Sequence, residues 1–219
     1  MAARSDSRSP SLEGELLAGF PFVVVAGVDE VGRGCLFGPV VTAAVILPED
    51  AAARLQTLVW LKNVKDSKLL SSAERERLFP EIQNFARGWS IAEASALEID
   101  QRNIHQATLL AMARAVHGLV LMPDHILVDG KFPIPGLEKK CTPLVKGDQR
   151  SLSIACASIL AKVYRDRLMI EWSARFPGYG FEVHKGYPTP DHLTALLRSG
   201  VTSEHRKSFA PVRDRLAAR

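Results

Sequence analysis

Acidic residues stand where an apolar segment of the chain ends. The run at 22–28 predicts a buried strand, and Asp29 and Glu30 follow it directly, ahead of a turn that holds Gly32 and Gly34. Ionised carboxylates beside a protein core are costly unless a positive charge compensates them. The pair therefore either faces solvent at a strand end or holds a cation.

Two further acids have a similar setting. Asp129, followed by Gly130, ends the short apolar run 125–128, and Asp148 lies in the segment "KGDQ". Taken singly, Asp129 fits a turn and Asp148 fits a helix cap. Because neighbouring strands bring such ends together, the recurrence favours a cluster of carboxylates, whose mutual repulsion a divalent ion would relieve. Oxygen ligands without His or Cys indicate Mg²⁺ or Mn²⁺ rather than zinc.

The geometry of a strand sets a condition on this interpretation. Adjacent strand residues point to opposite faces, so Asp29 and Glu30 are not expected to reach one ion unless Gly32 and Gly34 bend the chain. The glycine spacing here matches neither GxGxxG nor the Walker pattern, and the loop leads into Pro39 and an apolar run rather than a helix. A dinucleotide-binding loop is therefore excluded.

The remaining pattern predicts a mixed α/β or α+β sheet. Runs at 22–28 and 39–47 predict a hairpin, and small residues in a long helix after Ser151 or Ser153 would let that helix approach the sheet closely. The other expected elements are a short helix within 47–61, a helix capped by Ser71 or Ser72, strands at 89–95, 125–128 and 141–148, a helical stripe from Ile104 to Gly118, and a last helix at 190–199 after a loop-like stretch beyond Pro177.

The composition is that of one soluble domain. The chain has 219 residues, 47% hydrophobic and 24% charged, which predicts a single domain over 21–219. Residues 1–20 are rich in Ser, Arg and Ala without a long apolar segment, so we expect a flexible tail and no membrane span. Three cysteines without CxxC spacing predict reduced thiols in a cytoplasmic protein.

Positive charge is concentrated in one part of the chain. Between 139 and 185 nine Lys and Arg residues stand against four acids, a net +5 where the whole chain carries +4. This stretch fits either a surface that binds a polyanion or a solvated helix face. Lys162 and Arg165 could face nucleic acid or water, and Asp166 is expected to be a surface acid in local ion pairs.

Six segments resemble, in order, the ribonuclease HII family. The resemblance runs from about Val23 to Val212, with Val31 at a position where the family often has Ala and with an insert of variable length between Asp129 and Asp148. The segments are "GVDEVGRGCLFGPVVTAAVIL", "VKDSKLLS", "ILVDGK", "LVKGDQRSLSIACASILAKVYRDRLM", "HKGYPTPDHL" and "HRKSFAPV".

The resemblance implies a ribonuclease H-like fold, with a mixed five-stranded sheet flanked by helices. It implies that Gly32, Arg33 and Gly34 contact ribose 2′-hydroxyls, that Tyr187 stacks on the deoxyribose after an RNA–DNA junction, and that Lys68 contacts phosphate. The implied metal-binding and catalytic acids are Asp29, Glu30, Asp129 and Asp148.

The implied activity is metal-dependent cleavage of the RNA strand of RNA–DNA hybrids. It includes nicking 5′ of single ribonucleotides in duplex DNA, which leaves a 5′-phosphate and a 3′-hydroxyl, and we expect a monomer. Two alternatives are a DNA nuclease or resolvase of the same superfamily, against which the Gly-Arg-Gly turn argues, and a non-catalytic nucleic-acid-binding module whose acids only end strands.

Overall fold

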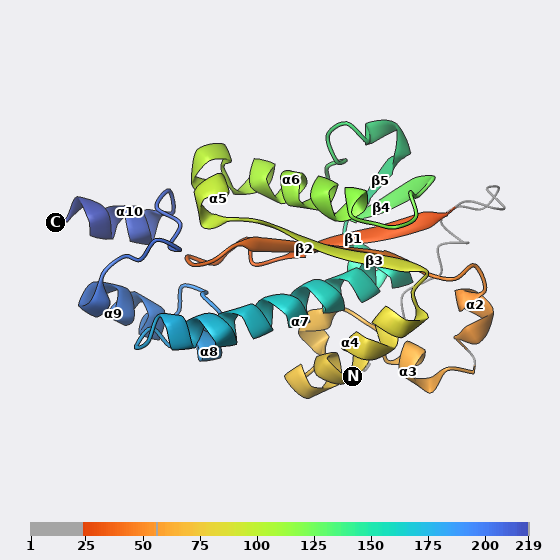
Figure 1. Cartoon of the computed structure of the whole chain (residues 1–219), viewed down its shortest axis with the longest axis horizontal. Helices are drawn as coiled ribbons and strands as arrows, with labels where there is room; N and C mark the ends of the chain where they lie inside the picture. The colour runs from red at the N-terminus through yellow and green to blue at the C-terminus, as the bar shows by residue number, and fades with distance from the viewer. Residues whose placement is uncertain (1–23, 56, 219) are drawn as a thin grey trace, which may run out of the picture.

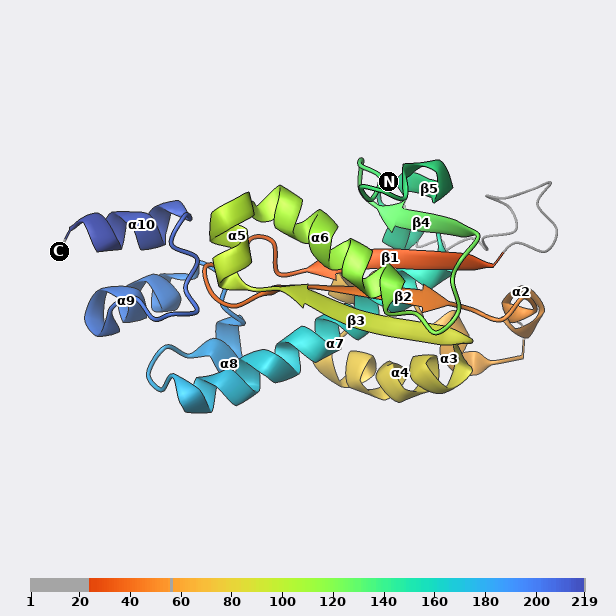
Figure 2. The ribbon, with the colours of Figure 1, turned by 45° about the horizontal axis from the view of Figure 1, so that its top comes forward.

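A five-stranded sheet lies between two layers of helices in the computed structural model, which describes residues 24–55 and 57–218 (Figures 1 and 2). The strand order is β3-β2-β1-β4-β5. The strands are β1 (Val25–Val31), β2 (Val40–Ile46), β3 (Gly88–Ala94), β4 (His125–Asp129) and β5 (Cys141–Leu144). β1 pairs antiparallel with β2 and parallel with β4. The predicted hairpin and the mixed five-stranded sheet flanked by helices are confirmed.

The helices divide between the two faces of the sheet. α6 (Ile104–His117) covers one face, preceded by α5 (Ala96–Arg102), while α7 (Leu152–Arg175) and α4 (Ser72–Phe85) cover the other (Figure 1). The shorter helices are α2 (Ala51–Arg54), α3 (Val59–Lys62), α8 (Phe181–His184), α9 (Pro190–Ser199) and α10 (Ala210–Ala217).

The side chains of β2 alternate between two cores. Val41, Ala43 and Val45 pack in the cluster on the α4 and α7 side, and Ala44 and Ile46 pack in the cluster on the α6 side. A strand buried on both faces reads as a continuous apolar run, which is why the sequence of this strand shows no polar alternation.

Helix α7 approaches the sheet closely where it begins. A Cβ on Gly27 of β1 would lie 2.3 Å from the backbone nitrogen of Ile154 and 2.3 Å from the carbonyl carbon of Ser153. Only glycine leaves room for this contact, and it brings the polar side chains of α7 next to the end of β1. The expected close approach of this helix is confirmed, and Ser151 is its N-cap.

Several expected elements differ in extent. The strand predicted at 141–148 is wrong beyond Leu144, because Lys146 takes a left-handed conformation (φ 57°) and a 3-10 turn follows over Gly147–Gln149. The short helix within 47–61 is two helices, α2 and α3.

The prediction for the C-terminal region is partly wrong. The helix at 190–199 is confirmed as α9, but the short helix α8 interrupts the loop-like stretch before it, and α10 follows it. The expected tail at 1–20 lies outside the described residues, whose helices include none long and apolar enough to cross a membrane.

Candidate active site

Three carboxylates meet where β1 and β4 end. Among the described residues, Asp29, Glu30 and Asp129 each offer an oxygen within 4.8 Å of the others. β1 and β4 run parallel, so their C-terminal ends lie at the same edge of the sheet. Asp129 is fixed by the backbone N–H of Gly147, which donates to its Oδ1 at 2.7 Å.

The prediction that Asp29 and Glu30 approach one another's ligand oxygens only if Gly32 and Gly34 bend the chain is wrong. Both residues belong to β1, which keeps its pairing with β2 as far as Val31. The parallel pairing with β4 ends earlier, at Val28, so the following acids flank the end of β4. With its additional methylene, the side chain of Glu30 can reach around the strand to the oxygens of the other two acids.

Burial disfavours the ionised forms of Asp29 and Glu30. Asp29 is buried, and its desolvation, followed by repulsion from Glu30 and Asp129, raises its pKa well above the ordinary value of 3.8; a hydrogen bond with Ser158 opposes this effect. Burial also raises the pKa of Glu30 above 4.5, opposed by the attraction of Arg33. The cluster therefore favours any cation that replaces the protons.

Asp148 lies beside this group but outside the set that meets within 4.8 Å. Burial, then repulsion from Asp66 and Asp129, raises the pKa of Asp148 to about 6, while Lys68 lowers it. Asp66, which the sequence analysis did not select, is buried and accepts a hydrogen bond at 2.9 Å from the backbone N–H of Lys68. Its place in the "KDSK" segment was the only available signal.

The glycine turn, which we define as residues 32–38, extends from the acids to Tyr187. Gly32 has a φ of 89° and is buried, whereas Arg33 and Gly34 are exposed. A Cβ on Gly34 would lie 3.9 Å from Cε1 of Tyr187, whose side chain is 38% exposed. An exposed stretch of backbone and a partly exposed aromatic ring therefore lie side by side.

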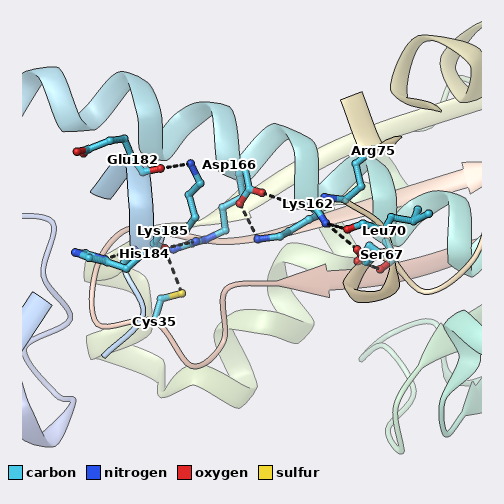
Figure 3. Close-up of polar contacts among 12 residues, drawn as sticks. Cys35, Ser67, Leu70, Arg75, Lys162, Asp166, Glu182, His184 and Lys185 are labelled. Atoms are coloured by element: carbon cyan, nitrogen blue, oxygen red, sulfur yellow. Dashed lines mark hydrogen bonds and ion pairs between the residues drawn. The ribbon is translucent and has the colours of Figure 1, made fainter. Parts of the chain in front are cut away.

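Two expectations for α7 are wrong. Asp166 is buried rather than on the surface, and it pairs with Lys162 at 2.7 Å and with Arg75 of α4 at 3.5 Å (Figure 3). Arg165 faces neither nucleic acid nor water: it is fully buried and donates to the backbone carbonyls of Phe37, Pro39 and Lys185. The expected local ion pair of Asp166 is confirmed by Lys162. The burial of these two residues escaped sequence reasoning because the partners of Arg165 are backbone carbonyls and Arg75 belongs to a distant helix.

Comparison with known proteins identifies the family. The family model described as Ribonuclease HII matches residues 26–212. The chain belongs to the ribonuclease HII family. It is 50% identical over its full length to ribonuclease HII 2 of Methylibium petroleiphilum, with 99% of that protein covered. It is 51% identical to ribonuclease HII of Geobacillus kaustophilus, with 89% of this chain and 71% of that protein covered.

Among solved structures, ribonuclease H2 of Pyrococcus horikoshii has the same fold. The TM-score is 0.74 at 25% identity, with 89% of this chain and 97% of that one covered. A ribonuclease HII is an endoribonuclease, so this chain hydrolyses the RNA strand of RNA–DNA hybrids. The expected family and class of reaction are confirmed.

The chemistry of the acid cluster fits a divalent metal. Its described ligand atoms are all carboxylate oxygens, and they lie close together in surroundings that penalise their charge. Such a set suits hard cations such as Mg²⁺ and Mn²⁺.

Proposed function

We propose that this ribonuclease HII is a divalent-metal-dependent enzyme that also nicks duplex DNA 5′ of a single embedded ribonucleotide, leaving a 5′-phosphate and a 3′-hydroxyl. The observation that carries the proposal is the meeting of Asp29, Glu30 and Asp129 beside the exposed edge of the glycine turn. This arrangement places groups suited to a metal next to a backbone that a sugar can approach.

Asp29, Glu30, Asp129 and Asp148 would hold Mg²⁺ or Mn²⁺. Ions held there would activate a water as the nucleophile and would stabilise the charge on the leaving 3′-oxygen. The Gly147 N–H keeps the Asp129 side chain oriented.

Recognition of the ribonucleotide is assigned to the glycine turn and Tyr187. Gly32, Arg33 and Gly34 would contact the 2′-hydroxyl, the group by which a protein distinguishes RNA from DNA. The ring of Tyr187 would stack on the deoxyribose that follows the junction, because its face is partly exposed beside Gly34. Lys68, exposed and close enough to lower the pKa of Glu30 and Asp148, would contact a phosphate.

Cleavage of three labelled duplexes tests the proposal: one with a single ribonucleotide, one all-DNA and one uniform RNA–DNA hybrid, each with Mg²⁺, Mn²⁺ or EDTA. We expect metal-dependent cleavage 5′ of the ribonucleotide and none of the all-DNA duplex. Cleavage of both would indicate a DNA nuclease, and binding without cleavage of any would indicate a non-catalytic module. Activity in EDTA would refute the metal dependence.

A matched pair of variants tests the acids. In Asp129→Asn the amide oxygen can still accept from Gly147, so we expect a folded protein that binds substrate but loses most turnover. The control is Asp214→Asn. Asp214 belongs to α10, outside the acid cluster, and its side chain is 69% exposed. Equal turnover in the two variants would remove Asp129 from the metal site. Light scattering tests the further prediction of a monomer.

A further inference from the structure

The glycine turn contacts the backbone of the loop that carries Tyr187. We define the tyrosine loop as residues 184–187; within it Gly186 accepts a hydrogen bond at 2.8 Å from the N–H of Leu36 in the glycine turn. Lys185 has a φ of 52°, a conformation that a residue with a side chain rarely adopts without support. The relative position of the two segments therefore depends on this backbone contact and on the side chains that bind the two backbones. One of these is Arg165, which donates to the carbonyls of Phe37 and Lys185.

Arg206 holds the glycine turn from within the protein. Its guanidinium is fully buried and donates to the carbonyl oxygens of Gly32 at 2.7 Å, Arg33 at 2.9 Å and Gly38 at 2.9 Å. In the described part of the chain Arg206 takes part in no ion pair. A planar group whose five donors are spread over three nitrogens is suited to fixing separated carbonyls, whereas the three donors of a lysine all sit on one nitrogen.

His205, the preceding residue, is connected to the tyrosine loop. The backbone N–H of Thr202 lies 3.1 Å from Nδ1 of His205, the Nε2 atoms of His205 and His192 lie 3.3 Å apart, and Nδ1 of His192 lies 2.9 Å from the carbonyl oxygen of Tyr187. Both rings are fully buried. The three contacts form a continuous series of hydrogen bonds from Thr202 to the backbone of Tyr187.

The partners at its two ends determine which atom donates in each hydrogen bond of this series. The Thr202 N–H can only donate, so Nδ1 of His205 accepts and its Nε2 carries the proton. The Tyr187 carbonyl can only accept, so His192 carries its proton on Nδ1 and accepts at Nε2. Burial lowers the pKa of His192 to about 4 and that of His205 to about 3, so both rings are neutral near pH 7 and the two Nε2 atoms are complementary.

We propose that His205 and Arg206 are positioning residues that hold the glycine turn and Tyr187 in register, so that recognition of a ribonucleotide junction depends on two adjacent residues that do not touch the substrate. The backbone of the same segment supports both sides: Arg206 N–H donates to Leu36 at 2.8 Å, and Glu204 accepts from Gly38 at 2.9 Å. The inference rests on the proposed roles of the glycine turn and Tyr187.

Variants of His192 test the chain of hydrogen bonds. Asn places its amide nitrogen near the position of Nδ1 and can donate to the Tyr187 carbonyl, whereas Leu, of similar size and shape, cannot. Both remove the same ring from the core, so we expect similar losses of thermal stability. The functional readout is the ratio of kcat/KM for the single-ribonucleotide duplex to kcat/KM for the uniform hybrid.

We expect His192→Leu, which loses both contacts of the ring, to lower this ratio about tenfold, because small displacements of a recognition group cost rate. His192→Asn keeps the contact with Tyr187 but loses the one with His205, so we expect it to lower the ratio by about threefold, and a wild-type ratio in this variant would remove His205 from the proposal. A purely structural role would lower both activities together and leave the ratio unchanged, and that result would overturn the proposal. If His192→Leu does not fold, His205→Gln, which keeps a donor near Nε2, is compared with His205→Met in the same way.

Arg206→Lys tests the hydrogen bonds from Arg206 to the glycine turn. It keeps a positive charge, but its three donors sit on one nitrogen and cannot reach the carbonyls that Arg206 binds through three separate nitrogens. The glycine turn would contact the 2′-hydroxyl of both ribonucleotide substrates, so here we expect kcat/KM on both to fall about tenfold while the metal-induced rise in Tm stays the same. Unchanged activity on both substrates would overturn this part. Failure of the wild-type protein to nick the single-ribonucleotide duplex would instead refute the proposed function, so the two failures are distinguishable.

Discussion

Replacing Asp148 by Asn should stabilise the metal-free protein while removing activity. Burial and the neighbouring acids Asp66 and Asp129 raise the pKa of Asp148 from 3.8 to about 6. At about 1.4 kcal/mol for each pKa unit, the folded protein at pH 8 loses about 3 kcal/mol by ionising this group. An Asn amide carries no charge and can donate to the Asp66 carboxylate, so most of this cost disappears.

The pH dependence follows from the direction of the shift. Below about pH 3 Asp148 is mostly protonated in both the folded and the unfolded chain, so the variant and the wild type should be equally stable, and at pH 4 they should differ by less than about 1 kcal/mol. Between about pH 4 and 6 the unfolded chain ionises first, and the wild type progressively loses stability relative to Asp148→Asn. Above about pH 6 the difference should reach its full value, about 2 to 3 kcal/mol.

Urea unfolding in EDTA at pH 4 and pH 8 measures this difference, and turnover on the uniform hybrid measures the loss of activity. Asp214→Asn, on the exposed surface of α10, serves as the control and should change the free energy of unfolding by less than about 0.5 kcal/mol at both pH values. A variant less stable than wild type at pH 8, or equally stabilised at pH 4, would refute the reasoning. Added Mg²⁺ should raise the Tm of the wild type more than that of the variant.

Three further predictions concern recognition, phosphate contact and packing. Tyr187→Phe should retain junction cleavage while Tyr187→Ala loses about tenfold or more in kcat/KM, since stacking needs the ring and not the hydroxyl; equal losses would contradict the stacking role. Lys68→Ala should weaken hybrid binding and reduce the slope of log K against log salt by about one, and an unchanged slope in a titration would exclude a phosphate contact. Gly27→Ala should cost more than about 3 kcal/mol in urea unfolding, because its Cβ would lie 2.3 Å from the backbone of Ile154; wild-type stability would mean that α7 can move away freely.

Much of the candidate site was predictable because its residues follow local rules. Apolar runs before Asp29 and Asp129 located two strands, although β1 continues to Val31, and the parallel pairing of β1 with β4 brings the two acids together. Gly32 was correctly placed in a turn, since its φ of 89° suits glycine. These features depend on a few neighbouring residues, which the sequence displays directly.

The parts that escaped prediction depend on contacts between distant segments. Arginine is usually an exposed residue type, yet Arg165 and Arg206 are both buried, and backbone carbonyls accept hydrogen bonds from their guanidinium groups. Nothing in the local sequence distinguishes an arginine that binds carbonyls from one that binds water. The reach of Glu30 around the strand likewise depends on where β4 ends, which alternation along a single strand does not reveal.

The place of β1 in the sheet has a consequence for synthesis of the protein. Its acids leave the ribosome early, but their neighbours Asp129 and Ser158 come from segments made about 100 and 130 residues later. Local pairing with β2 can form at once, whereas the parallel pairing with β4 and the packing of α7 must wait for most of the chain. The acid cluster can therefore assemble only near the end of translation. A truncated product that lacks α7 carries Asp29 and Glu30 without the surroundings that complete the site.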